Sequence, residues 1–192
     1  MSEHQTPQQP NMTRAQAAKA DLFFWLQALV IALVVLILLF TFVGRIITVD
    51  GSSMLPTLHH KDVLLLRTVA YTPEQGDVVV LTKDFSGYTN QPIVKRVIAV
   101  EGDTVDISDD GYMVVNGEEL YEPYAKEAIR DSERGTQQYP LTVLEDHVFA
   151  VGDNRNGSTD SRWVEVGQIE EARVIGKALF RIWPLNRIGG LS

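Results

Sequence analysis

Two adjacent hydroxyl side chains lie in a segment that can expose a nucleophile. Residues 51–58 read Gly-Ser-Ser-Met-Leu-Pro-Thr-Leu and follow an apolar run that ends at Val49. Glycine permits a tight backbone turn and proline stops strand pairing, so the segment predicts a bend at the end of a strand. Such a bend would present Ser52 or Ser53. An ordinary turn capped by serine explains the same residues, and a serine attacks only when a base takes its proton.

Histidine is the usual base for a serine nucleophile, but the histidines of this chain are poorly placed for that role. His59 and His60 stand very close to Ser53 in the sequence, and His147 has only the acidic pair at 145–146 beside it. A conventional Ser-His-Asp triad is therefore disfavoured.

Lysine is the other candidate base, because burial removes water from an ammonium group and lowers its pKa. Residues 92–100 read Pro-Ile-Val-Lys-Arg-Val-Ile-Ala-Val, which places Lys95 and Arg96 inside an otherwise apolar strand. Alternation points the two side chains to opposite faces, so one can be buried and the other paired. An edge strand whose charges discourage aggregation has the same pattern, and the strand alone leaves both explanations open.

A third polar cluster follows the apolar run at 148–151. Residues 152–162 read Gly-Asp-Asn-Arg-Asn-Gly-Ser-Thr-Asp-Ser-Arg, which is denser in hydrogen-bonding groups than a simple surface loop needs. A solvated turn and an Asp-rich cation loop are alternatives, but the spacing of the acidic residues does not fit an EF-hand. We therefore expect no metal and no cofactor.

A long apolar segment precedes these motifs. From Leu22 to Val43 the only polar residues are Gln27 and Thr41, and a helix of this length spans roughly 33 Å, against a hydrocarbon core of about 30 Å. We predict a transmembrane helix at 21–44, because a cleaved signal peptide would have a shorter apolar region that ends in small residues. Residues 1–20 lack apolar periodicity and are predicted to form a disordered cytoplasmic tail, although the flanking charges favour this orientation only slightly.

The remaining residues, 45–192, alternate short apolar runs with turn residues, which is typical of β structure. The Asn-Gly pair at 116–117 predicts a two-residue hairpin turn. Residues 122–140 carry mixed charges and are expected to be an exposed excursion between strands. The composition predicts one mostly β domain, an antiparallel β-barrel or sandwich, with expected strands at 46–49, 63–66, 77–81, 93–100 and 174–182. With the tail in the cytoplasm, this domain is expected to be extracytoplasmic.

The composition also restricts the chemistry and the partners. The formal net charge of -8 leaves no basic surface for nucleic acid, so nucleic-acid partners are disfavoured. The chain has no cysteine, which excludes thiolate nucleophiles, thiolate metal sites and disulfides. The oligomeric state has no signal in the sequence.

The three motifs, in this order behind one N-terminal anchor, resemble those of bacterial type I signal peptidases, the Ser-Lys leader peptidases of peptidase family S26. The matching segments are 51–58, 95–103 and 152–162, and the resemblance runs from the anchor to Trp183-Pro184. It implies a membrane-anchored endopeptidase that removes signal peptides from secreted preproteins on the outer membrane face, cutting after a small-x-small tripeptide such as Ala-x-Ala.

The resemblance also implies a role for each site residue. Ser53 is the implied nucleophile, Lys95 is the implied base, and Ser158 matches a serine that helps to orient the lysine amine. The implied supporting polar residues are Asp153, Asp160, Arg162 and Arg96. The backbone N–H of Ser53 is expected to bind the oxyanion, and the residues in its vicinity are Gly51, Ser52, Met54 and Pro56. Some relatives carry a serine where this chain has Gly51, so a second oxyanion donor is not assigned.

The expected substrate is an extended chain that pairs with strand edges at 46–51 and 92–95. Nine residues separate Val43 from Ser53, and fully extended they reach about 30 Å. The nucleophile would therefore stay near the membrane surface, where the cleavage site of a signal peptide also lies.

Two other functions fit part of the pattern. A self-cleaving Ser-Lys protease of the LexA type shares the catalytic logic, but the anchor and the lack of a helix-turn-helix argue against it. A catalytically silent, membrane-tethered β-domain that binds a partner would use the same loops as architecture, and intact Ser53 and Lys95 argue against that.

Overall fold

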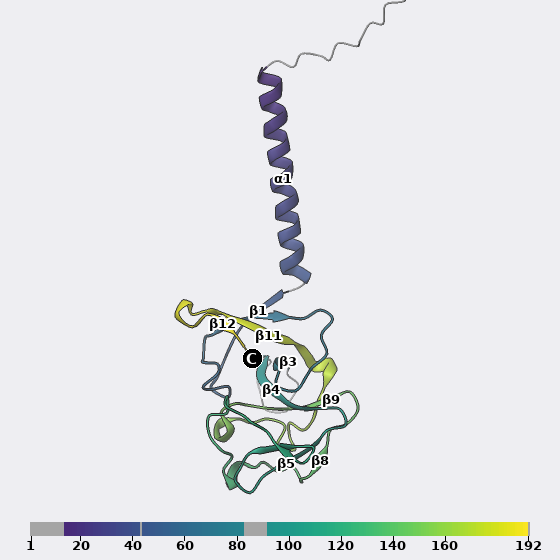
Figure 1. Ribbon diagram of the computed structural model, residues 1–192, viewed down its shortest axis with the longest axis vertical. Coiled ribbons are helices and arrows are strands. Elements are labelled where there is room, and N and C mark those ends of the chain that lie inside the picture. Colours follow the sequence, from purple (N-terminus) through teal and green to yellow (C-terminus); the bar gives the residue numbers. More distant parts are fainter. Residues whose placement is uncertain (1–13, 43, 83–91, 192) are drawn as a thin grey trace, which may run out of the picture. The chain divides into compact units, whose positions relative to one another are not determined.

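The computed structural model describes residues 14–42, 44–82 and 92–191 (Figure 1). The chain divides into two compact units, residues 1–41 and 42–192. Helix α1 (Arg14–Phe42) contains every described residue of the first unit, and every described strand lies in the second.

Helix α1 begins earlier than the sequence predicts. Residues 14–20, expected in the disordered tail, are helical, because Arg, Ala, Gln and Lys all have high helix propensity. Residues 1–13 of the predicted tail lie outside the described residues. Large apolar side chains from Leu22 to Ile37 are exposed on α1. In the described parts of the chain, no helix is both long enough and apolar enough to cross a membrane.

The described residues of the second unit form two antiparallel sheets. The larger one has eight strands in the order β1-β2-β11-β3-β4-β9-β10, with β12 paired to β11, and the smaller one has the order β7-β6-β5-β8. The strands of the larger sheet are β1 (Gly44–Thr48), β2 (Val63–Arg67), β3 (Val78–Leu81), β4 (Ile93–Val100), β9 (His147–Val151), β10 (Ile169–Glu170), β11 (Val174–Trp183) and β12 (Gly189–Gly190). The smaller sheet consists of β5 (Thr104–Ile107), β6 (Met113–Val115), β7 (Glu118–Glu119) and β8 (Leu141–Thr142).

Four 3-10 turns complete the described elements, and the prediction of a mostly β, antiparallel domain is confirmed. The turns are η1 (Asp131–Glu133), η2 (Arg155–Gly157), η3 (Glu171–Arg173) and η4 (Leu185–Arg187). The predicted hairpin joins β6 to β7, and its Asn116 and Gly117 have φ angles of 54° and 83°. Both angles are positive, as a type I′ turn requires.

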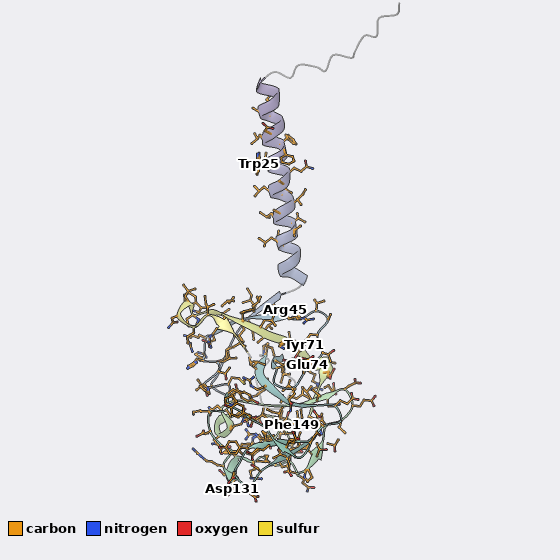
Figure 2. The ribbon with its side chains drawn as sticks, viewed as in Figure 1. Trp25, Arg45, Tyr71, Glu74, Asp131 and Phe149 are labelled. Atoms are coloured by element: carbon orange, nitrogen blue, oxygen red, sulfur yellow. The ribbon has the colours of Figure 1, made fainter. Side chains whose placement is uncertain are left out.

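Strand β4 is an interior strand of the larger sheet, paired with β3 on one side and β9 on the other. Lys95 and Arg96 on it are only 4% and 0% exposed. The alternative of an edge strand with solvent-exposed charges is therefore wrong. Around β4 the two sheets enclose an apolar core that includes Phe149 of β9 and Met113 of β6, and Figure 2 labels Phe149 within it.

The segment at 122–140 is exposed only in part, whereas its mixed charges predict an exposed excursion. The Glu122 side chain is 1% exposed and Ile129 is 4% exposed, in the apolar core. The charged side chain is buried because it forms an ion pair with Arg155, a partner that sequence patterning does not reveal.

Candidate active site

The turn that carries Ser53 is fixed by the apolar residues that follow it. Met54 and Leu58 are 1% and 0% exposed, and both pack in one cluster with Val94 of β4. The Leu58 N–H donates to the Met54 carbonyl at 2.8 Å, which closes the turn. Ser53 is thus half-buried beside β4, while Ser52 remains exposed.

The start of the 152–162 segment holds the backbone of Ser53. The Asn154 N–H donates to the Ser53 carbonyl at 2.9 Å, and the Asn154 side-chain amide donates to the Ser52 carbonyl at 3.1 Å. Gly152 approaches so closely that a Cβ added there would overlap both the Ser53 carbonyl oxygen and the Ser158 Oγ. Only glycine fits between these two groups.

Lys95 points its amine at the same loop. Its Nζ donates a hydrogen bond of 2.9 Å to the Ser158 Oγ, and both residues are buried. Burial is the largest influence on the Lys95 pKa and lowers it from 10.5 to about 8, while the nearby Asp160 carboxylate opposes part of this change. Lys95 therefore has the protonation properties of a general base.

Three buried carboxylates in this part of the domain, two of them near Lys95, are paired with arginines. Each of three guanidinium groups makes two hydrogen bonds to one carboxylate, so the carboxylate charges are largely neutralised. The pairs are Arg96 with Asp153 at 3.0 and 3.0 Å, Arg162 with Asp160 at 2.8 and 2.9 Å, and Arg155 with Glu122 at 2.8 and 2.6 Å. Lys95 itself donates to a hydroxyl, which explains why its charged form gains too little to offset burial.

Burial and a charged neighbour also act in opposite directions on the pKa of Asp160. Burial acts to raise the pKa of its carboxyl, but the hydrogen bonds and charge of Arg162 outweigh burial and hold the pKa below the usual range. The ionised Asp160 also accepts the Gly152 N–H at 3.0 Å. The carboxylate thus joins Arg162 to the backbone that lies against Ser53 and Ser158.

The structure brings most of the expected site residues together. Ser53, Lys95 and Ser158 gather around Gly152, and the supporting set of Arg96, Asp153, Asp160 and Arg162 is fully buried beside them. Three residues expected in the oxyanion vicinity lie apart from this network. Met54 belongs to the core, Pro56 is exposed, and Gly51, with a φ of 100°, directs its N–H to His60.

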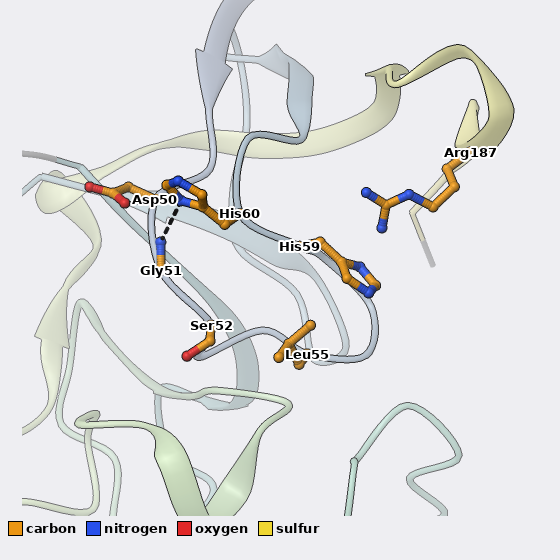
Figure 3. A pocket seen from close by; sticks show the side chains of 7 residues that line it. All are labelled: Asp50, Gly51, Ser52, Leu55, His59, His60 and Arg187. Atoms are coloured by element: carbon orange, nitrogen blue, oxygen red, sulfur yellow. Dashed lines mark hydrogen bonds and ion pairs between the residues drawn. The ribbon is translucent and has the colours of Figure 1, made fainter.

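A groove of about 650 Å³ opens beside Ser52, lined by residues 50–52 with Leu55, His59, His60 and Arg187 (Figure 3). His60 Nδ1 lies 3.4 Å from the Gly51 nitrogen and 3.2 Å from the Asp50 carboxylate. These contacts engage His60 with its own neighbours, so the described hydrogen bonds give no support to a histidine base for Ser53.

Sequence reasoning missed several residues that complete the site. Gly152, Asn154 and Arg155 lie inside the 152–162 motif but had no assigned role, and their density of polar atoms is the signal that could have singled them out. Thr57 donates to the Asp153 carboxylate. Glu122 has no local sequence signal, because its partner Arg155 is remote in the chain.

Comparisons with known proteins find the same family throughout. The family model described as signal peptidase, peptidase S26, matches residues 22–183. Signal peptidase I of Bacillus licheniformis is 38% identical over 178 residues, which cover 88% of this chain and 93% of the relative. Signal peptidase I S of Bacillus subtilis (strain 168) is 36% identical over 179 residues, covering 88% and 94%. The crystal structure of a signal peptidase I from Enterococcus faecalis V583 is 32% identical and covers 56% of this chain and 97% of that one, with a TM-score of 0.43.

The family model and these relatives define the class of this protein as a serine peptidase, which is a hydrolase. Within that class the chain belongs to the signal peptidase family, peptidase S26. The resemblance inferred from the three motifs is confirmed.

Proposed function

We propose that this chain is a membrane-anchored endopeptidase that removes signal peptides from secreted preproteins, with Ser53 as nucleophile and Lys95 as general base. The observation that carries the proposal is the buried Lys95 amine, which lies 2.9 Å from Ser158 Oγ and has a pKa of about 8. Such an amine is neutral in an appreciable fraction of molecules near neutral pH, so it can accept a proton. Membership of the signal peptidase family supports the substrate class.

In the proposed reaction, the neutral Lys95 amine takes the hydroxyl proton as Ser53 Oγ bonds to the carbonyl carbon of the scissile peptide. The carbonyl π electrons move to the oxygen, which accepts a hydrogen bond from the Ser53 N–H. Collapse of this intermediate breaks the C–N bond, and the Lys95 ammonium returns the proton to the leaving amine. Water then attacks the acyl-serine while Lys95 takes its proton. Lys95 passes this proton to Ser53 Oγ as the bond between the acyl carbon and Oγ breaks, which releases the signal peptide with a free carboxylate and restores the enzyme.

Two strand edges support binding of an extended substrate. Among the described pairings, β1 has β2 as its one neighbour. Strand β9 ends at Val151 opposite Arg96, so residues 93–95 of β4 pair with no strand on that side within the part of the chain that the structure describes. Each edge offers main-chain groups to an added strand. We infer that the residues before the scissile bond pair there, with small side chains in the small-x-small positions.

We further infer that residues 21–44 anchor the enzyme, with the N-terminus in the cytoplasm and the peptidase domain outside. The apolar sequence from Leu22 to Val43 supports this inference, as do the exposed side chains of Phe23 and Trp25, at 75% and 71%. Exposed apolar area of this kind needs a cover, and lipid is the natural one. A full-length chain that leaves the membrane fraction in high salt or alkaline carbonate, without detergent, would contradict the anchor.

The test of the function is cleavage of a preprotein that carries an Ala-x-Ala site, by the detergent-solubilised full chain. We expect the wild type to cut after the tripeptide and both Ser53→Ala and Lys95→Ala to lose at least about 10³-fold in kcat. Ser132→Ala, at an exposed serine in η1, is the matched control and should keep full activity. If Ser53→Ala cuts normally while Ser52→Ala does not, the nucleophile has been assigned to the wrong serine.

A further inference from the structure

The segment from Glu122 to Arg130, called the brace here, runs alongside the start of the 152–162 loop and contacts it repeatedly. The Lys126 N–H donates to the Asp153 carbonyl at 2.8 Å. The Asn156 side chain joins both sides, donating to the Ala128 carbonyl at 2.9 Å and accepting the Arg130 N–H at 2.9 Å. The brace therefore bonds to the loop backbone and side chains over several successive residues.

The strongest contact of the brace is the ion pair between Glu122 and Arg155. The side chains are each 1% exposed, and both guanidinium NH2 groups donate to the carboxylate, at 2.8 and 2.6 Å. Tyr124 adds two contacts to this ion pair. Its hydroxyl donates a hydrogen bond to Glu122 at 3.1 Å, and the centre of its ring lies 3.8 Å from the Arg96 guanidinium carbon. A buried bidentate pair of this kind fixes the direction in which the rest of the guanidinium points.

The third nitrogen of Arg155 connects this pair to the reacting groups. Its Nε donates to the Gly152 carbonyl at 3.1 Å, while the Gly152 N–H donates to Asp160 at 3.0 Å. Both peptide groups that flank the Gly152 Cα are thus fixed. Gly152 in turn lies in close contact with the Ser158 Oγ and the Ser53 carbonyl. A displacement of Gly152 would change where Ser158 meets Lys95.

We propose that Glu122 is a positioning residue for the Ser53–Lys95 centre, acting through Arg155 and the Gly152 carbonyl. The inference rests on the proposed function and adds a residue outside all three sequence motifs to the machinery. Glu122 touches none of the reacting atoms. Its effect is to hold the 152–158 backbone in its position relative to Ser53. This position matters because misplacement of a reacting group by about 1 Å is enough to reduce catalysis by about 100-fold.

A purely structural ion pair and a positioning pair predict different results in a double variant. Buried ion pairs can often be replaced by apolar side chains of similar size without loss of stability. The double variant Glu122→Leu/Arg155→Met removes both charges together, so neither is left buried without a partner. Methionine at 155, however, cannot donate a hydrogen bond to the Gly152 carbonyl. We expect this variant to unfold near the wild-type temperature and to have a kcat lower by about 10- to 100-fold with KM almost unchanged.

Single variants and a control complete the design. Glu122→Gln keeps the shape but loses the charge, and we expect its kcat, expressed per folded molecule, to fall less than that of the double variant. Glu170→Gln removes an exposed ion pair with Arg173, whose atoms are 3.4 Å apart, and should match the wild type throughout.

Amide hydrogen exchange of residues 152–158 provides a readout that needs no substrate. We expect exchange in the double variant to be faster by about tenfold, the equivalent of one lost hydrogen bond. A stable double variant with wild-type kcat, or with wild-type exchange in this loop, overturns the role of Glu122. Failure of the wild type itself to cleave the preprotein would instead count against the proposed function. The exchange measurement would still test whether the Glu122–Arg155 pair holds the 152–158 backbone.

Discussion

Burial of Lys95 predicts how the cleavage rate depends on pH. Burial lowers the pKa of Lys95 to about 8, with Asp160 opposing part of the change. With this pKa the neutral amine makes up about 10% of the enzyme at pH 7 and about 90% at pH 9. In the proposed mechanism only the neutral form accepts the Ser53 proton, so kcat/KM should rise about tenfold over this range and then level off.

An exposed lysine would give a different curve. With the ordinary pKa of 10.5, the neutral fraction would rise about 100-fold between pH 7 and pH 9 and continue to rise beyond it. The size of the rise and the position of the plateau therefore measure how far burial has shifted the amine, and not merely whether a base is present.

The assay is the initial rate of preprotein cleavage at substrate concentrations well below KM, from pH 6 to pH 10.5 at constant ionic strength. Enzyme held at each pH and returned to pH 7 serves as the control for irreversible inactivation. A rate that is flat over the whole range would remove Lys95 from the role of base. A rate that still rises tenfold per pH unit above pH 9 would refute the burial argument.

Three further predictions concern the same network. Lys95→Met should stabilise the domain by about 3 kcal/mol at pH 7, measured by urea unfolding, and the gain should vanish above pH 10.5. The sign follows because, between pH 8 and 10.5, the unfolded chain holds a proton that native Lys95 has lost, so wild-type stability rises with pH. Asp160→Asn should move the midpoint of the pH–rate profile below 8, because it removes the charge that raises the Lys95 pKa. The same variant should lower the free energy of unfolding by about 3 to 5 kcal/mol, because the buried Arg162 loses its carboxylate partner. Gly152→Ala should reduce kcat by about 100-fold or more, since its Cβ would overlap Ser158 and the Ser53 carbonyl; wild-type kcat in this variant would contradict the packing.

The buried charges around Lys95 would destabilise the folded domain if they were not paired. Arg96, Arg155 and Arg162 are each at most 1% exposed, and each guanidinium would be strongly destabilising without its carboxylate. Paired, the three arginines fix the orientation of backbone groups by bidentate geometry while leaving little net charge near the amine. This arrangement is suited to a lysine base, because a single unpaired carboxylate nearby would restore its proton.

Local sequence patterns determined much of this protein. The hairpin at Asn116-Gly117, the apolar strand at 93–100 and the polar density of 152–162 depend on residues close together in the chain, whose conformational preferences act without remote partners. The ordered motifs also sufficed to identify the peptidase family. The transmembrane helix, the site roles and the cleavage motif remain predictions from the same patterns.

Other features depend on which remote segments meet, and only the tertiary structure decided them. The strand at 93–100 alone left Lys95 either exposed on an edge or buried, and its exposure of only 4% in the folded domain settled this. Charge patterning made Glu122 appear solvated, whereas Arg155, more than 30 residues away, buries it. A buried charge is stable only beside its partner, and the sequence does not state where a partner will be until the chain has folded.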